Sequence, residues 1–139
     1  MNQGRRFERA DELVEAAAAA RLMAYAPYSH FMVGAAVLAG GKIFAAPNME
    51  IASYPLSVCA ERNAVAAAVA AGNTKIEAVA IVGSGEHPTP PCGGCRQVLF
   101  EFGGEELAVI VESPSGEREA WSLSELLPRA FGPRDLPAT

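Results

Sequence analysis

The sequence predicts an α/β protein, a three-layer α-β-α sandwich with one mixed five-stranded sheet. Three observations lead to this fold class. Segments with helical and strand character alternate along the chain in the order α-β-β-α-β-α-β-β-α. Two of the strands are continuous apolar runs, which are typical of strands buried on both faces of a sheet. The turn before the last strand is too short for a helical crossover, so the last two strands should be antiparallel.

The first part of the chain predicts a helix followed by a hairpin. Residues 10–25, ADELVEAAAAARLMAY, are good helix formers with apolar positions spaced for one face. We expect this helix to end before Pro27, because the residue ahead of a proline avoids helical dihedrals. The stretch 31–46 predicts two strands joined by Gly40-Gly41, a pair that suits a tight hairpin turn.

The second part predicts the other strands around further helices. A helix from about 58 to 71 should end at Gly72, in the position after a helix where glycine is favoured. Another helix spans about 92–102. Ser122, with Glu125 three residues later, forms a capping box that begins a final short helix. Three strands complete the sheet, at 76–83, at 107–111 and near 119–121.

The composition fits one globular domain over residues 1–139 and disfavours several classes of partner. Half of the residues are hydrophobic, so a core is available. The net charge is −5 and the 11 Lys and Arg residues are scattered, whereas nucleic-acid-binding proteins cluster such residues to contact phosphates. No stretch approaches the ~20 apolar residues that cross a bilayer, and no secretory signal is visible. We therefore expect a cytoplasmic protein with no nucleic-acid or membrane partner.

The three cysteines predict a metal site. Cys92 and Cys95 form a C-x-x-C motif at the start of a predicted helix, where free N–H groups favour thiolates. Cys59 begins the preceding helix and completes a set of three sulfurs if the two helices pack side by side. Three thiolates suit Zn²⁺. Neither His30 nor His87 has the spacing of a fourth ligand, so one position of the ion is left for water, as in catalytic zinc sites.

Two charged residues next to Cys59 fit such a site. Glu61 lies two residues after this cysteine and can reach a metal-bound water without binding the metal. Most glutamates in this position would only be a favourable charge in a first helical turn. Arg62 is either a solvated surface residue or a hydrogen-bond donor to the thiolates, and we favour the second role. The catalytic prediction for Glu61 depends on its place beside three thiolates.

Five segments, in order along the chain, resemble the cytidine deaminases of free-nucleoside salvage. Zinc deaminases share the signature H-x-E followed by P-C-x-x-C, and this chain has Cys59 in the histidine position. The form with three cysteines resembles the small-subunit, homotetrameric branch of the family. The resemblance runs from about Tyr25 to Leu136, and its segments are YAPYSHFMVGAA, NMEIASYPL, CAER, PCGGCRQVLFEFG and ELLPRAFGPRDL.

The resemblance implies the reaction and most of the substrate contacts. A zinc-activated water would attack C4 of cytidine or deoxycytidine, and Glu61 would carry its proton to N3 and then to the leaving ammonia. Asn48 and Glu50 correspond to the ribose-binding pair, although on their own they would suggest a polar turn. Phe31 corresponds to the aromatic residue that flanks the base, although on its own it would suggest the edge of a core strand. The backbone of Ala60 corresponds to a further contact with the base.

The resemblance also implies an assembly. Ala52 and Tyr54 match positions that one neighbouring subunit contributes to the site, and Phe131 matches a C-terminal aromatic residue from another neighbour. We therefore expect a homotetramer whose sites are completed across subunit contacts. One position departs from the family pattern. Ile51 follows Glu50 where relatives usually have an asparagine, so the amide that could brace the ribose loop is missing here.

Two alternatives remain open on the sequence alone. The same machinery could act on another cytosine nucleoside such as blasticidin S, although Asn48, Glu50 and Phe131 favour ordinary nucleosides. A non-catalytic alternative is a structural zinc module or a redox C-x-x-C protein. The zinc module needs a fourth protein ligand, and the redox protein needs a disulfide between Cys92 and Cys95.

Overall fold

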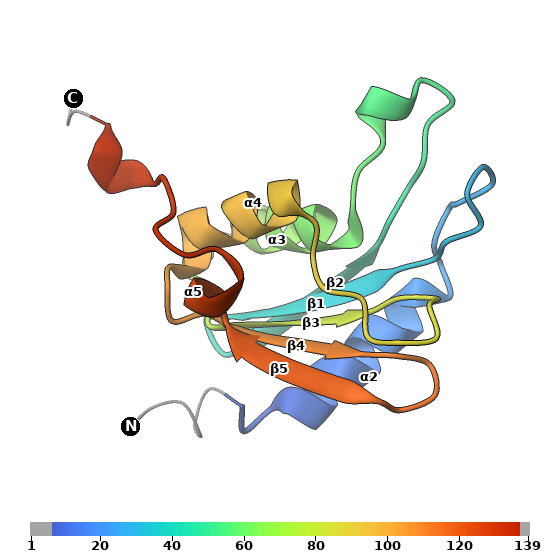
Figure 1. Ribbon diagram of the computed structural model, residues 1–139, viewed down its shortest axis with the longest axis horizontal. Coiled ribbons are helices and arrows are strands. Elements are labelled where there is room, and N and C mark those ends of the chain that lie inside the picture. The colour runs from blue at the N-terminus through green and yellow to red at the C-terminus, as the bar shows by residue number, and fades with distance from the viewer. Residues whose placement is uncertain (1–6, 137–139) are drawn as a thin grey trace.

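The computed structural model describes residues 7–136, so residues 1–6 and 137–139 of the expected domain lie outside the described residues. Its centre is a sheet of five strands, β1 (Gly34–Ala39), β2 (Lys42–Pro47), β3 (Ala78–Val82), β4 (Ala108–Glu112) and β5 (Arg118–Ser122). The strand order is β2-β1-β3-β4-β5 (Figure 1). β3 and β4 are parallel and the other neighbours are antiparallel. This confirms the predicted mixed sheet and its antiparallel last pair.

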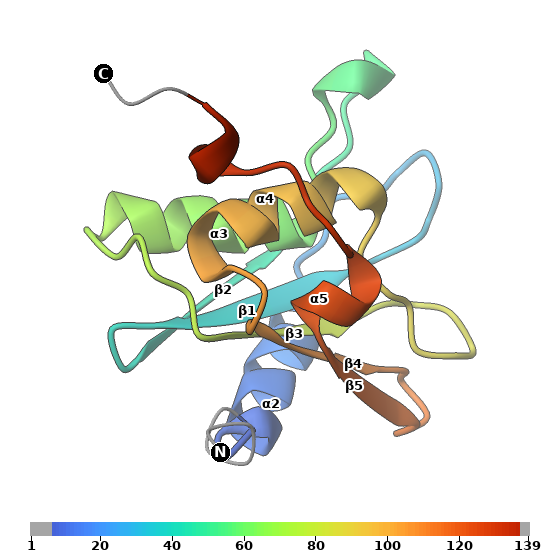
Figure 2. The same ribbon diagram turned by 60° about the vertical axis from the view of Figure 1, so that its left-hand side comes forward.

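Helices cover both faces of the sheet and give the three predicted layers. The longer helices are α2 (Ala10–Arg21), α3 (Ala60–Ala70) and α4 (Gly93–Gly103). α2 packs on one face, and α3 and α4 lie side by side on the other (Figure 1 and Figure 2). Within residues 7–136, no helix has the length and apolar character needed to span a membrane. The short elements are α5 (Leu123–Leu126), η1 (Tyr54–Leu56) and η2 (Pro133–Asp135).

Side-chain alternation along the central strands divides the core into two layers. Val37 of β1, Val79 of β3 and Val109 of β4 belong to the layer under α3 and α4. Their neighbours in sequence, such as Ala36 and Ala80, face α2 in the second layer. The small side chains on this second face let α2 lie close to the sheet.

The first helix is shorter than the sequence predicts. It ends at Arg21, and a residue that follows it pairs instead with the loop that contains Met49. Tyr25 forms a β-bridge with Met49. The Tyr25 N–H donates to the carbonyl oxygen of Asn48 at 3.1 Å, and the Glu50 N–H donates to that of Tyr25 at 2.8 Å. Tertiary pairing therefore overrides the helical propensity of this segment.

The first strand also starts later than predicted, after Val33. Side chains hold the segment that precedes it. The Asn48 Oδ1 accepts the Val33 N–H at 2.9 Å and its Nδ2 donates to the Phe31 carbonyl at 3.0 Å. The Ser84 hydroxyl accepts the Met32 N–H at 3.1 Å and donates to the Met32 carbonyl at 2.9 Å. Two side chains thus take the place of a neighbouring strand.

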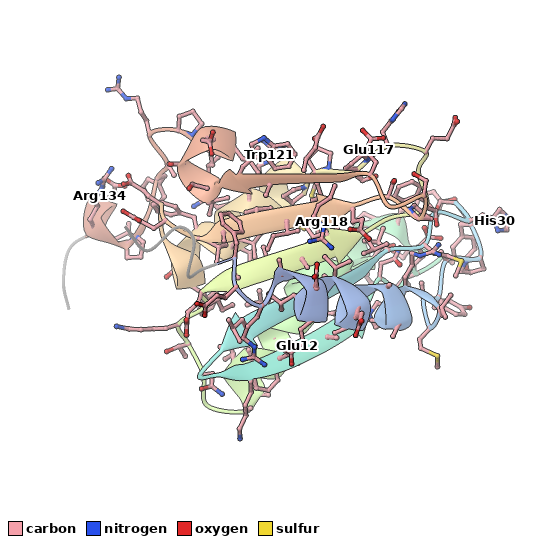
Figure 3. The ribbon with its side chains drawn as sticks, turned by 90° about the horizontal axis from the view of Figure 1, so that it is seen from below. Glu12, His30, Glu117, Arg118, Trp121 and Arg134 are labelled. Carbon is pink, nitrogen blue, oxygen red and sulfur yellow. The ribbon has the colours of Figure 1, made fainter. Side chains whose placement is uncertain are left out.

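The hairpin of β4 and β5 contacts α2 through an ion pair that the sequence did not predict. It leads into α5 through the capping box that the sequence did predict. Arg118 of β5 points toward α2 (Figure 3), where it pairs with Asp11 at 2.8 Å, and it also pairs with Glu112 of the neighbouring strand β4 at 2.7 Å. The predicted capping box forms at α5, since the Ser122 N–H donates to Glu125 at 2.8 Å. The hairpin therefore connects the two layers of helices.

Candidate metal centre

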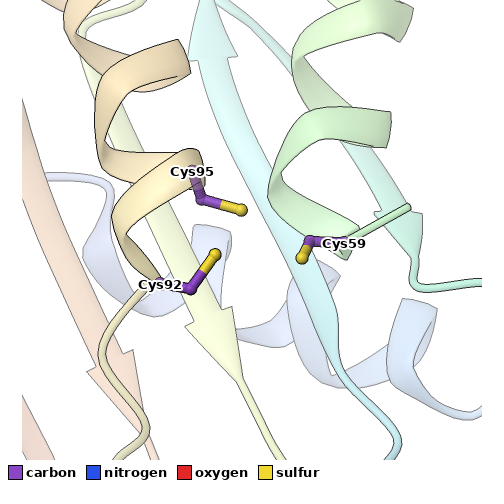
Figure 4. Close-up of side chains that lie close together, drawn as sticks. All are labelled: Cys59, Cys92 and Cys95. Atoms are coloured by element: carbon purple, nitrogen blue, oxygen red, sulfur yellow. The ribbon is translucent and has the colours of Figure 1, made fainter. Parts of the chain in front are cut away.

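The three cysteines meet where two helices begin (Figure 4). Cys59 immediately precedes α3, Cys92 immediately precedes α4, and Cys95 lies in the first turn of α4. Their Sγ atoms all lie within 4.8 Å of one another. Both helices start slightly later than predicted, because Cys59 and Cys92 have extended backbones and occupy the N-cap positions.

Local hydrogen bonds hold these helix ends. The Asn63 N–H donates to the Cys59 carbonyl at 3.1 Å, and the Arg96 N–H donates to the Cys92 carbonyl at 2.9 Å. The Asn63 side chain also donates to the Pro47 carbonyl at 2.9 Å, which fastens the start of α3 to the end of β2. Because α3 and α4 pack side by side on one face of the sheet, the sulfurs at their starts face one another.

Helix ends and neighbouring groups favour thiolates at this position. Unpaired N–H groups and the helix dipole attract negative charge at each N-terminus. A hydrogen bond with Cys95, and a further one from Arg62, lower the pKa of Cys59 to about 5. The same contact with Cys59, together with burial, raises the pKa of Cys95. Cys59 therefore favours the thiolate form, and a cation bound at this position would displace the proton that Cys95 retains.

This donor set fits a tetrahedral Zn²⁺ ion with one position free of protein. Zn–S bonds of ~2.3 Å place three sulfurs about 3.8 Å apart, within the observed limit. Among residues 7–136, no other group of three His, Cys, Asp or Glu side chains could hold an ion. His30 lies in an exposed turn with a φ of 62°, and His87 contacts Glu117 at 3.3 Å. Neither histidine joins the cysteines, which are all free thiols.

Glu61 lies in the first turn of α3, with only 5% of its surface exposed. Burial raises its pKa to about 7, although its own backbone N–H and the Cys95 thiol lower it in part. A carboxyl group that titrates near neutrality can both accept and release a proton. Glu61 borders the same cavity as Cys59 and Cys92, so this acid and the three sulfurs form one site.

A cavity of about 280 Å³ opens beside the sulfurs. This volume is just below the ~300–1,000 Å³ typical of ligand sites, so the cavity suits a small ligand. Its described lining includes no Lys or Arg, which disfavours an anionic ligand. The apolar wall and few polar groups suit a small planar ring with hydrogen-bonding edges. The apolar wall includes Phe31, Val33, Val58, Ile81 and Pro90, and the polar groups include Asn48, Glu50, Glu61 and Thr89.

Comparisons with known proteins decide the family. The family model for the cytidine and deoxycytidylate deaminase zinc-binding region matches residues 7–111. The chain belongs to this deaminase family. A cytidine deaminase of Halalkalibacterium halodurans is 42% identical over 125 residues, which cover 89% of this chain and 95% of that relative. One of Mycobacterium tuberculosis is 44% identical over 115 residues, which cover 82% of this chain and 83% of that relative.

A solved structure of the deaminase family confirms the fold. The crystal structure of cytidine deaminase from Burkholderia pseudomallei matches with a TM-score of 0.84 and 48% sequence identity. The match covers 87% of this chain and 98% of that one. The family resemblance and the α/β fold class expected from the sequence are therefore both confirmed.

Four of the residues expected to contact the substrate of a deaminase line the cavity. They are Phe31, Asn48, Glu50 and Ala60. Ala60 is fully buried at the start of α3. The Asn48 amide is held by the backbone of Phe31 and Val33, and one of its N–H groups is left for a ligand.

Glu50 is held as a carboxylate at the rim of the deaminase cavity. It accepts the backbone N–H groups of Tyr28 and Ser29, both at 3.1 Å, and the Ser29 hydroxyl. These hydrogen bonds, chiefly those from Ser29, lower its pKa. The Ile51 N–H donates to the Ser57 hydroxyl at 3.0 Å. The loop after Glu50 is therefore braced by Ser57, although Ile51 stands where the family resemblance led us to expect an asparagine.

The other three expected contacts lie outside the cavity of their own chain. Ala52 and Tyr54 are exposed on the projecting loop that carries η1 (Figure 1). Phe131 is 59% exposed beyond α5. Tyr54 instead borders a second cavity of about 300 Å³, which shares Ser29, Glu50 and Ser57 with the first.

Loops contribute residues that the sequence did not single out. Ser29, Ser57, Thr89 and Pro90 all line the cavity. Thr89 and Pro90 come shortly before the P-C-x-x-C motif, which is the one sequence signal that could have found them. Arg62, which the sequence did single out, is among the groups that lower the pKa of Cys59.

Proposed function

We propose that this protein is a zinc-dependent cytidine deaminase that consists of one domain. It would convert cytidine and deoxycytidine, with water, into uridine and deoxyuridine plus ammonia, as a step of pyrimidine salvage. The observation that carries the proposal is the meeting of three thiols, Cys59, Cys92 and Cys95, beside the buried Glu61 in a cavity of suitable size. Membership of the deaminase family supports the same activity.

The sulfurs of Cys59, Cys92 and Cys95 would hold the zinc ion. When bound, zinc acts as a Lewis acid that makes a water molecule nucleophilic near neutral pH. Arg62 would offset part of the negative charge of three thiolates through its hydrogen bond to Cys59. The positive N-terminal ends of the α3 and α4 dipoles would also stabilise the negative charge of these thiolates.

Glu61 would transfer the protons of the reaction. It would take a proton from the attacking water, deliver it to N3 of the cytosine ring, and then transfer a proton to the departing amino group. Ammonia leaves and the ring keeps the oxygen of water at C4, so the atoms balance. A buried carboxyl with a pKa of about 7 suits both uptake and release near neutral pH.

Cavity residues would orient the nucleoside. Phe31 would flank the base, and the backbone of Ala60 would contact its edge. The free N–H of Asn48 and the carboxylate of Glu50 would bind the sugar hydroxyls, since together they offer a donor and acceptors. Both groups are already fixed by backbone contacts, so little ordering is needed on binding.

The activity is tested with purified protein, cytidine and a parallel measurement of bound metal. Loss of the ultraviolet band of cytidine, with one zinc per chain, would support the proposal. Deoxycytidine and blasticidin S are compared as further substrates. Faster turnover of blasticidin S than of cytidine would favour the alternative substrate. Stoichiometric zinc without turnover of any of the three would favour a structural zinc module.

We also propose that the protein forms a homotetramer in the cytoplasm. Ala52, Tyr54 and Phe131 lie outside the cavity of their own chain and would complete sites of neighbouring subunits. Large apolar side chains such as Leu22 and Met23 are 68% and 75% exposed, which suits subunit contacts. Three reduced thiols suit a reducing compartment. Light scattering during size-exclusion chromatography measures the assembly, and a monomeric mass would contradict it.

A further inference from the structure

The guanidinium of Arg96 joins two separate pieces of backbone. Its Nε donates to the Pro91 carbonyl at 2.7 Å, and one terminal nitrogen donates to the Leu126 carbonyl at 2.7 Å. Both are short for N–H···O hydrogen bonds, as expected when the donor is charged. The side chain is half-buried and does not line the cavity described above. We therefore expect Arg96 to act through the protein and not by direct contact with a nucleoside in that cavity.

The first of these hydrogen bonds acts on the turn that carries two sulfurs. Pro91 immediately precedes Cys92, so its carbonyl orientation helps to set the backbone of that cysteine. The next two residues, Gly93 and Gly94, give little support, because the places where their Cβ atoms would lie are empty to 4 Å. Glycines also leave the chain more freedom to be ordered. Arg96 follows Cys95 directly, and its side chain reaches back across the turn to Pro91.

The second hydrogen bond acts on the C-terminal segment, residues 126–132. Leu126 is the last residue of α5. The next residue of α4, Gln97, donates to the Phe131 carbonyl at 2.7 Å. Gly132 lies so close to the ring of Phe100 that a Cβ atom there would overlap it. Three positions of α4 therefore hold this segment, which passes over the helix in Figure 2.

We propose that Arg96 is a positioning residue for the metal centre, which fixes the Pro91–Cys95 turn and joins it to the C-terminal segment. This inference rests on the metal site of the proposed function. A guanidinium presents several N–H groups in a rigid planar fork and can bind two carbonyls at once. A lysine ammonium is a single point of charge on a flexible stem, so it cannot hold both carbonyls in the same geometry.

Zinc affinity of the whole protein tests this role, by competition with a colorimetric chelator. The variants are Arg96→Lys, which keeps the charge, and Arg96→Gln, which removes it. Gln97→Ala is the matched control, because it releases the same C-terminal segment and leaves Pro91 held. We expect Arg96→Lys and Arg96→Gln to lose about 10- to 100-fold in zinc affinity, as for other residues that orient metal ligands. Gln97→Ala should stay within about twofold of the wild type.

Further measurements separate positioning from a general loss of structure. Circular dichroism of each variant checks the fold, and Arg96→Lys decides the matter if Arg96→Gln does not fold. With saturating zinc, the KM for cytidine should be unchanged in Arg96→Lys, because Arg96 does not line the cavity. Wild-type zinc affinity in both Arg96 variants, or an equal loss in Gln97→Ala, would overturn the inference. A wild-type protein without zinc would overturn the proposed metal site as well.

Discussion

Burial sets the chemistry of two side chains at the metal centre, Glu61 and Cys95. Glu61 is 5% exposed, and its pKa is raised to about 7 because the surrounding protein disfavours the charged form. Cys95 is fully buried at the end of the same cluster. Substitution of Glu61 should therefore affect proton transfer, whereas substitution of Cys95 should affect metal binding.

Glu61→Gln should remove proton transfer while it keeps the shape of the side chain. We expect kcat for cytidine to fall by about 10²- to 10⁴-fold, whereas zinc content and the unfolding temperature should stay near those of the wild type. Steady-state kinetics and elemental analysis measure these quantities. Wild-type kcat in this variant would exclude Glu61 from the mechanism.

Cys95→Ala should lose bound zinc and some stability. One sulfur of three is removed from a site whose formation is coupled to folding, so the affinity and the melting temperature should fall together. Elemental analysis after dialysis, combined with thermal unfolding, checks both. An unchanged zinc content would show that the ligand set is wrong.

Ser29→Ala should raise the pKa of Glu50. The Ser29 hydroxyl is the largest of the influences that lower this pKa, so its removal moves the value up toward that of an ordinary glutamate. Glu50 would then protonate at a less acidic pH, and the KM for cytidine should begin to rise earlier as the pH falls. Carboxyl chemical shifts in an NMR titration measure the pKa directly.

Ser57→Ala is the matched control for this titration. Ser57 lines the same cavity, but its hydroxyl accepts the Ile51 N–H and is not among the groups that hydrogen-bond the Glu50 carboxylate. Its loss should leave the titration of Glu50 unchanged. Equal shifts in the two variants would mean that the cavity as a whole, and not the Ser29 hydroxyl, sets the pKa.

Close packing of α2 on β1 depends on one glycine. A Cβ atom at Gly34 would overlap the carbonyl oxygen of Ala17 and the backbone of Arg21. Both of these contacts are backbone atoms, which cannot turn aside as a flexible side chain can. The sequence alone predicted a strand through Gly34 but could not show why that position lacks a side chain.

Gly34→Ala should therefore destabilise the protein by about 1–3 kcal/mol, the usual cost of overpacking a core. Gly93→Ala is a control with the opposite environment, because no atom lies within 4 Å of its Cβ position. That control should lose no stability. Chemical denaturation of both variants measures the difference, and equal stabilities would contradict the packing argument.

At the scale of the whole molecule, the exposure of Phe131 outside the cavity of its own chain leads to a test of shared sites. The Glu61→Gln and Phe131→Ala variants should each be weakly active alone. When the two are unfolded, mixed and refolded, some sites would combine an intact Glu61 with a neighbour's intact Phe131. About a quarter of wild-type activity is expected from random assembly with one such contact per site.

The control mixture pairs Glu61→Gln with Cys95→Ala. Both changes alter residues that lie together within one chain, yet each subunit still supplies an intact Phe131. No hybrid site then contains both Glu61 and Cys95, so activity should not recover. Recovery in this control, or none in the test mixture, would contradict sites completed by neighbours.

Sequence and structure agree best where signals are local. Cys92 and Cys95 are one helical turn apart, and the capping box at Ser122 needs only residues within the same turn, so spacing alone predicts both. Helix and strand ends were predicted less well. Tyr25 was predicted to lie in the first helix, but its backbone pairs with Met49. No pattern in the sequence near Tyr25 indicates such a distant partner.

By itself, the sequence determined the alternation of helices and strands, and it predicted three candidate sulfur ligands with an acid next to one of them, because periodicity and short spacings act along the chain. Only the tertiary structure decided that Cys59 faces Cys92, that Ser29 fixes Glu50 and that Arg96 reaches Leu126. These contacts form between residues far apart in sequence. They depend on how the layers pack, since hydrogen bonds and burial require distances that residue order does not specify.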